Sequence, residues 1–127
     1  MKIKIRIWTM SKQYSIFADD QTKEFTIGLH NIKKGVEDFV REAIQIVKDW
    51  PDRLENLEVM DGISYKIAYD NGMTTRELVG MNQVPKNFVE LMSLIEKKDP
   101  DTAEDAVREE QERKFFKYLK SLGINWR

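Results

Sequence analysis

The chain has 127 residues, enough for one domain with its own hydrophobic core and too few for a second independent one. Its composition, 41% hydrophobic and 34% charged, predicts a soluble globular protein and excludes an intrinsically disordered one. The formal net charge of -1 excludes a strong overall attraction to nucleic acid or to anionic membranes, so a charged partner has to be recognised by a local patch.

The first residues, MKIKIRIW, alternate isoleucine with charged residues and contain no continuous apolar run. They therefore predict neither a signal peptide nor a membrane span. The chain contains no cysteine, which removes disulfides, thiol nucleophiles and thiolate metal sites. We expect a cytoplasmic protein that does not bind a membrane.

The N-terminal alternation also predicts the first strand, with its three isoleucines on one face and Lys4 and Arg6 on the other. Residues 14–18 and 24–29 predict a second and a third strand. They are joined by the sequence DDQTK, whose aspartates favour a turn because their side chains bond the nearby backbone. The second and third strands should therefore form a hairpin.

An amphipathic helix is predicted for residues 33–50, where apolar side chains recur at the spacing of one helix face. Pro51 ends it, since the residue before a proline is disfavoured in the helical conformation. Residues 63–69 and 73–79 then predict a second hairpin around Asn71-Gly72, a strong turn signal.

A second helix is expected after Pro85, with apolar residues at Phe88, Leu91, Met92 and Ile95. Residues 101–123 predict a third helix, capped near Thr102 and ended by Gly123. The middle of this segment, REEQER, is polar on all sides, so we expect that part to stand in solvent.

The segments 14–50 and 65–97 share one pattern of residues. Tyr14, Ile16, Asp19 and Gly28 match Tyr65, Ile67, Asp70 and Gly80. The pattern predicts a tandem ββα repeat whose two units share a core, with the glycines at the passage from strand to helix. The expected fold for residues 1–127 is a single α+β domain: a two-layer sandwich with an antiparallel sheet of about five strands, an N-terminal strand and a C-terminal helix.

Catalytic candidates are the single histidine, His30, and the turn carboxylates Asp19, Asp20 and Asp70. In the repeat alignment His30 corresponds to Asn82, which indicates a polar structural position, and the aspartates are explained as turn formers. The sequence has no Gly-rich phosphate loop, no nucleophile elbow and no helical histidine pair. We therefore expect a protein that is not an enzyme and needs no cofactor or metal; a small enzyme with a carboxylate site between the repeats is the least favoured alternative.

The sheet face opposite the isoleucines is the candidate binding surface. Residues expected there are Lys2, Lys4, Arg6, Trp8, Ser15, Phe17 and Lys66. All of these except Ser15 are candidate binding residues, because a basic face with interleaved aromatics suits a protein interface. The same face could bind single-stranded nucleic acid by stacking bases and neutralising phosphates. It could also be an ordinary solvated face, or be covered in part by the C-terminal helix.

The favoured function is therefore non-catalytic protein binding, of the kind performed by immunity proteins, phage-encoded inhibitors and small regulatory adaptors of bacteria or phages. Nucleic-acid binding through the basic face is the alternative. The sequence does not specify an oligomeric state.

Overall fold

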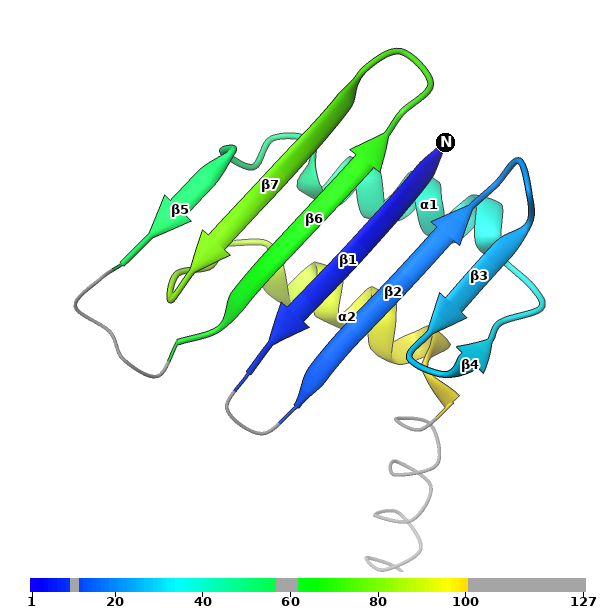
Figure 1. Ribbon diagram of the computed structural model, residues 1–127, viewed down its shortest axis with the longest axis horizontal. Coiled ribbons are helices and arrows are strands. Elements are labelled where there is room, and N and C mark those ends of the chain that lie inside the picture. Colours follow the sequence, from blue (N-terminus) through cyan, green and yellow to red (C-terminus); the bar gives the residue numbers. More distant parts are fainter. Residues whose placement is uncertain (10–11, 57–61, 101–127) are drawn as a thin grey trace, which may run out of the picture.

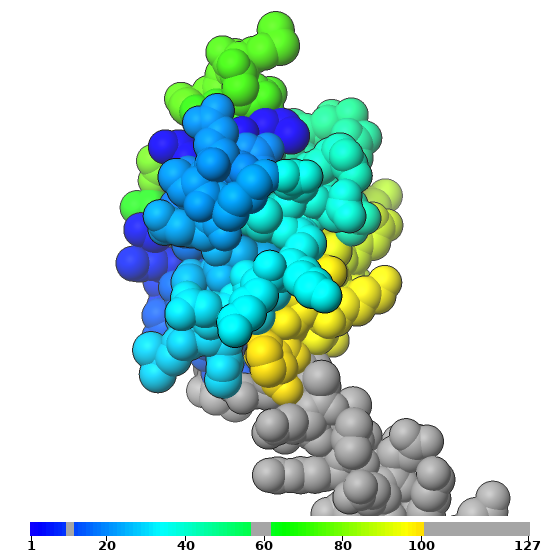
Figure 2. Space-filling model, turned by 90° about the vertical axis from the view of Figure 1, so that its right-hand side faces the viewer, coloured from blue at the N-terminus to red at the C-terminus, as the bar shows by residue number. Residues whose placement is uncertain are grey.

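The computed structural model describes residues 1–9, 12–56 and 62–100, which form a mixed α+β fold with a seven-stranded sheet and two helices. The strands are β1 (Lys2–Trp8), β2 (Gln13–Asp19), β3 (Glu24–Ile27), β4 (His30–Asn31), β5 (Arg53–Glu55), β6 (Ser64–Asp70) and β7 (Thr75–Met81). The helices are α1 (Val36–Val47) and α2 (Phe88–Lys98). Both helices lie on the same face of the sheet (Figure 1), and the edge-on view shows the two layers (Figure 2). The predicted α+β class is confirmed.

The strand order is β4-β3-β2-β1-β6-β7-β5, with the N-terminal strand in the middle. Neighbouring strands are antiparallel except β5 and β7, which are parallel. The prediction of about five antiparallel strands is corrected to seven strands. The two that it lacked are the edge strands, the two-residue β4 and the three-residue β5. Strands this short show no period of two in the sequence, so the pattern that identified the longer strands could not reveal them.

Both hairpins pair with β1 in the same register. The equivalent pairings join Lys2 to Asp19 and Asp70, Ile5 to Ile16 and Ile67, and Ile7 to Tyr14 and Tyr65. Matched residues of β2 and β6 therefore occupy equivalent positions on the two sides of one strand. This shared register explains why the two stretches of sequence resemble each other.

The structure does not confirm a tandem ββα repeat. Strands β2 and β6 run in the same direction, but β3 lies on one side of β2 and β7 lies on the opposite side of β6. Both hairpins carry their helix on the same face of the sheet (Figure 1). No rotation superposes two such units, because they are related as an object is to its mirror image.

The core lies between the sheet and the two helices. Phe39 of α1 is fully buried, and its ring packs on Phe25 with the ring centroids 4.6 Å apart. A second aromatic group joins Trp50, Tyr65 and Phe88, with centroids 5.3 to 6.3 Å apart. The apolar stripe predicted from helical spacing therefore faces the core, as expected.

The two matched glycines have different roles, so the expectation that both mark a passage from strand to helix is wrong. Gly28 has a φ of +60° in the turn between β3 and β4. Gly80 lies inside β7, directly against the ring of Tyr65, and a Cβ there would come within 2.0 Å of the Tyr65 Cε1 atom. Only glycine leaves room for this ring.

Asp19 and Asp70 act as turn formers, as the sequence indicated, whereas the Asp20 carboxylate binds the N-terminal amine of Met1 at 2.7 Å. The Asp19 Oδ1 atom accepts a hydrogen bond of 2.9 Å from the Gln21 N–H, and the Asp70 Oδ1 atom accepts one of 2.8 Å from the Gly72 N–H. The predicted third helix, at 101–123, lies outside the described residues. Neither described helix has the length and apolar character needed to cross a bilayer.

Candidate binding face of the sheet

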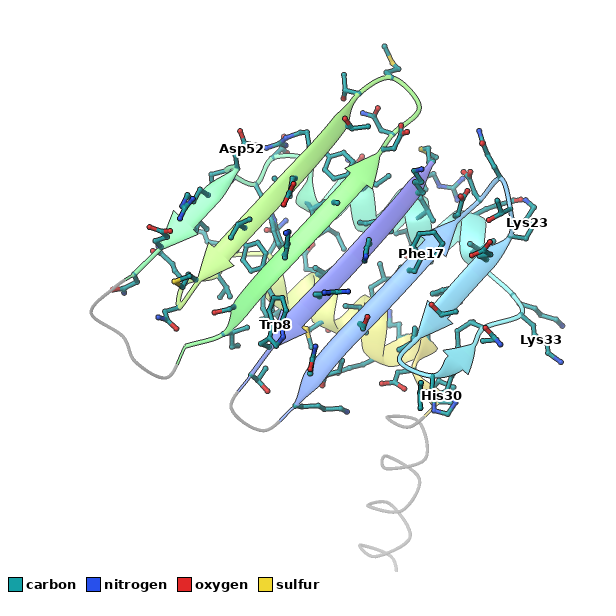
Figure 3. The ribbon with its side chains drawn as sticks, viewed as in Figure 1. Trp8, Phe17, Lys23, His30, Lys33 and Asp52 are labelled. Atoms are coloured by element: carbon teal, nitrogen blue, oxygen red, sulfur yellow. The ribbon has the colours of Figure 1, made fainter. Side chains whose placement is uncertain are left out.

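The face of the sheet that points away from α1 and α2 is called the open face here. Burial alternates along β1, where Ile3, Ile5 and Ile7 are buried while Lys4 and Arg6 are exposed. The alternation arises because successive side chains of a strand point to opposite faces. Within residues 1–9, 12–56 and 62–100, both helices lie behind the sheet, and the open face is turned toward the viewer in Figures 1 and 3.

All of the residues expected on this surface lie on the open face. Phe17 pairs with Lys4, while Ser15 and Lys66 pair with Arg6 from opposite sides. Trp8 lies at one end of this group of side chains and Lys2 at the other, with Phe17 beside Lys4 between them. Trp8 and Phe17 are labelled in Figure 3. Trp8 is 36% exposed, so part of its indole is accessible on this face. The register thus brings the predicted binding residues onto one continuous surface.

The open face also carries carboxylates that the sequence interpretation did not count. Asp19 and Asp70 lie beside Lys2 on either side, and Glu77 makes a salt bridge of 3.2 Å with Lys66. The face therefore carries carboxylates at Asp19, Asp70 and Glu77 among its cations, which corrects the description of a basic face. The carboxylates were overlooked because turn formation explained Asp19 and Asp70 completely.

The electrostatic setting of Asp19 reflects this arrangement. The backbone N–H of Gln21 donates to its carboxylate and lowers the pKa of that carboxyl below its usual value, and the positive charge of Lys2 contributes to the same shift. Asp19 therefore remains ionised next to Lys2. One of the predicted binding cations, Lys2, is thus flanked by anions of its own chain.

Three cations of the open face, Lys2, Lys4 and Arg6, form no side-chain hydrogen bond or salt bridge within the described part of the chain. Lys2 has Asp19 and Asp70 as cross-strand neighbours, whereas Lys4 and Arg6 have no carboxylate in that position. Both are exposed and lie between the two aromatic side chains of β1 and β2, Trp8 and Phe17. These two side chains are the ones available to an acidic group of a partner.

A hollow of about 400 Å³ opens on the same face, around Ala68 of β6. Its lining includes Lys4, Phe17, Ala68, Asp70, Thr75 and Glu77. The hollow exists because the short side chain of Ala68 lies between longer ones, Lys4 of β1 and Glu77 of β7, which are its cross-strand partners. A second hollow of about 220 Å³ shares Lys4, Ala68 and Glu77 and extends toward Arg6.

The candidate catalytic histidine is not brought together with the aspartates. His30 lies on β4 at one edge of the sheet, where it pairs with Ile27 (Figure 3). Asp19 pairs with Glu24 at the other end of β3, and Asp70 lies across β1 from Asp19. In the described ranges, no three histidine, cysteine, aspartate or glutamate side chains come close enough to hold a metal ion.

A separate hollow of about 270 Å³ lies beside His30 and is also lined by Lys12, Tyr14 and Asp99. It is remote from Asp19 and Asp70, so it does not create the predicted site between the two hairpins.

Comparison of the chain with protein-family models, with curated proteins and with solved structures found no match.

Proposed function

We propose that this chain is a non-catalytic protein-binding domain whose partner docks on the open face of the sheet. The observation that supports the proposal is the group formed by Trp8, Arg6, Lys4 and Phe17, two aromatics and two cations that form no salt bridge with the described residues, on a face that the described helices leave uncovered. Tryptophan and arginine are the residues most enriched among those that dominate protein interfaces. The function is of the kind performed by immunity proteins, phage-encoded inhibitors or regulatory adaptors, and we place it in the cytoplasm.

The distribution of charge favours a protein partner over a nucleic acid. A polyanion gains affinity from each phosphate that a continuous track of cations neutralises. Here Asp19 and Asp70 lie on the two strands adjacent to β1, and Glu77 of β7 already pairs with Lys66 of β6. A protein surface can match such alternating charges, whereas a phosphate backbone is repelled by the carboxylates.

The proposal is tested by affinity capture from the native host with the immobilised full-length chain, followed by mass spectrometry. Three versions are compared: the wild type, Trp8→Ala, and the control Leu29→Ala, which truncates a fully exposed leucine in the turn before β4. We expect one protein to be retained by the wild type and by Leu29→Ala and to be lost with Trp8→Ala. Retention that is equal for all three versions contradicts the proposal.

The captured protein is then titrated against purified variants. Trp8→Ala should weaken binding by about 2 kcal/mol or more, roughly 30-fold, because a buried interface tryptophan is a typical energetic centre. The double variant Lys4→Ala/Arg6→Ala should act mainly on the association rate, since exposed interface charges steer the encounter.

The same proteins are titrated with single-stranded oligonucleotides at two salt concentrations. If the open face binds nucleic acid, the wild type binds the oligonucleotide tightly, and its affinity falls steeply as the salt concentration rises. The loss of Lys4 and Arg6 then lowers the slope of log affinity against log salt concentration by about two. That result replaces our proposal by the nucleic-acid alternative. Binding neither to a protein nor to an oligonucleotide identifies the open face as an ordinary solvated surface.

A further inference from the structure

We propose that the hollow around Ala68 receives one bulky apolar side chain of the partner, carried on an acidic segment whose carboxylates pair with Lys4 and Arg6. This inference rests on the proposed function and specifies the chemistry of the partner. It concerns the β1, β6 and β7 part of the open face, beside the aromatic group that defines the interface.

The size and lining of the hollow favour an apolar occupant. A volume of about 400 Å³ holds on the order of a dozen waters, at about 30 Å³ each. The floor is the methyl group of Ala68, and the ring of Phe17 contributes to the lining. Water over such apolar surface is displaced favourably by an apolar side chain. A leucine, phenylalanine or tryptophan fits this description.

The polar groups around the hollow determine the charge of the segment that carries this side chain. Glu77 is paired with Lys66, and Asp70 accepts a hydrogen bond from the Gly72 N–H and lies beside Lys2. Each of these two carboxylates thus has a donor or a cation of its own chain beside it. Lys4 and Arg6 have no carboxylate as a cross-strand neighbour, so charge complementarity calls for acidic residues in the partner.

The sheet geometry limits where those acidic residues can lie in the partner sequence. Lys4 is the direct cross-strand partner of Ala68, and such pairs have Cβ atoms about 5 Å apart. Arg6 is the diagonal neighbour, at about 7–8 Å. An extended segment rises about 3.3 Å per residue. A carboxylate that reaches Lys4 or Arg6 therefore lies within about two residues of the apolar side chain.

The probe is a random peptide library displayed on phage and selected on the immobilised full-length chain. Selected peptides are synthesised and titrated against the wild type, Ala68→Leu and Ala68→Gln. Both substitutions fill the hollow at an exposed strand position, one with an apolar and one with a polar side chain, so a common effect comes from the lost space. Ser93→Leu, an equally exposed enlargement on α2, is the matched control.

We expect a consensus with one bulky apolar residue and at least one Asp or Glu within two positions of it. Both Ala68 variants should weaken binding about tenfold or more, and Ser93→Leu should not change it. Charge reversal with Lys4→Glu/Arg6→Glu should abolish selection of the acidic peptides, whereas Lys33→Glu/Lys34→Glu, in the exposed loop before α1, should not.

The outcomes separate this inference from the proposed function. Peptides that are basic, that lack an apolar residue, or that bind the Ala68 variants as well as the wild type overturn the inference. If those peptides are still lost with Trp8→Ala, the open face remains the interface and only the role of the hollow is wrong. If the library yields no peptide sensitive to Ala68, Lys4, Arg6 or Trp8, both proposals fail.

Discussion

Replacement of Gly80 by alanine tests the packing that fixes β6 against β7. Gly80 pairs with Tyr65, and an added Cβ would lie 2.0 Å from the Cε1 atom and 2.4 Å from the Cζ atom of that ring. The ring is confined, because its centroid is 5.3 Å from Trp50 and 6.2 Å from Phe88. Overpacking of a confined site costs about 1–3 kcal/mol, and these distances indicate the upper end of that range.

The free energy of unfolding should be measured by urea denaturation, with a thermal scan in parallel. We expect Gly80→Ala to lose about 3 kcal/mol out of a total near 5–15 kcal/mol. The thermal midpoint should fall by roughly 10 °C for a domain of this size. The circular dichroism spectrum of the folded state should not change, since the sheet itself remains formed.

The same substitution in a Tyr65→Leu background provides the control. Leucine leaves space where the tyrosine ring lay, so Gly80→Ala should cost clearly less there, which is the non-additivity expected for residues in contact. An unchanged unfolding free energy for the single variant, or an equal loss in both backgrounds, would refute the argument that the Tyr65 ring is what requires glycine at position 80.

Three further predictions follow from burial and position. Phe39→Ala should lower the unfolding free energy by about 3–5 kcal/mol, because it removes a fully buried ring that packs on Phe25; an unchanged thermal midpoint would show that this helix face is not in the core. Tyr65→Phe should stabilise the fold by about 1 kcal/mol, because the buried Tyr65 hydroxyl has no hydrogen-bond partner in the described part of the chain. Burial also raises the pKa of Tyr65, so as the pH rises the unfolded chain loses the Tyr65 hydroxyl proton before the folded chain does. The unfolding free energy of the wild type should therefore decline above pH 10.0 more than that of Tyr65→Phe, as measured by urea titrations at several pH values. His30→Asn should leave partner binding unchanged in a titration, since His30 lies on the edge strand β4 outside the open-face group; lost binding with intact stability would restore a functional role for the histidine.

The sequence predicted the elements whose side chains repeat with a clear period. Three isoleucines at alternate positions were sufficient for β1, and the apolar stripe around Phe39 was sufficient for α1. The edge strands β4 and β5 were missed because two or three residues carry no period, and because β5 is recognised only through its pairing with β7. Long-range pairing of this kind leaves no local signal in the chain.

The resemblance between the two hairpins shows a different limit of sequence patterns. Tyr14 and Tyr65 match because each pairs with Ile7, and Asp19 and Asp70 match because each pairs with Lys2. Matched residues thus share a cross-strand partner on the two sides of one strand without forming a superposable unit. The repeated sequence pattern therefore indicated that the two hairpins pair with β1 in equivalent registers. It did not indicate on which side of β2 and β6 the second strand of each hairpin lies.

The open face itself was predictable from alternation, whereas its charge pattern and its hollow were not. Alternation assigns each side chain to a face, but only the register shows that Glu77 lies across from Ala68 and close enough to bind Lys66. The hollow depends on the relative lengths of side chains on three adjacent strands. Such a comparison requires the strand order, which places β6 between β1 and β7.

The charge pattern also predicts how binding should respond to salt. Lys2 lies beside Asp19 and Asp70, and Lys66 pairs with Glu77, so Lys4 and Arg6 are the two cations of this group without a carboxylate as a cross-strand neighbour. Salt at physiological concentration screens the field of these two cations beyond the Debye length of about 8 Å, so they steer the partner only over the last part of its approach. The face should therefore select its partner by short-range complementarity, with a modest salt dependence. Binding of a polyanion depends on many phosphate contacts, so its affinity would fall steeply with salt concentration. The salt slope alone therefore distinguishes a protein partner from a nucleic acid.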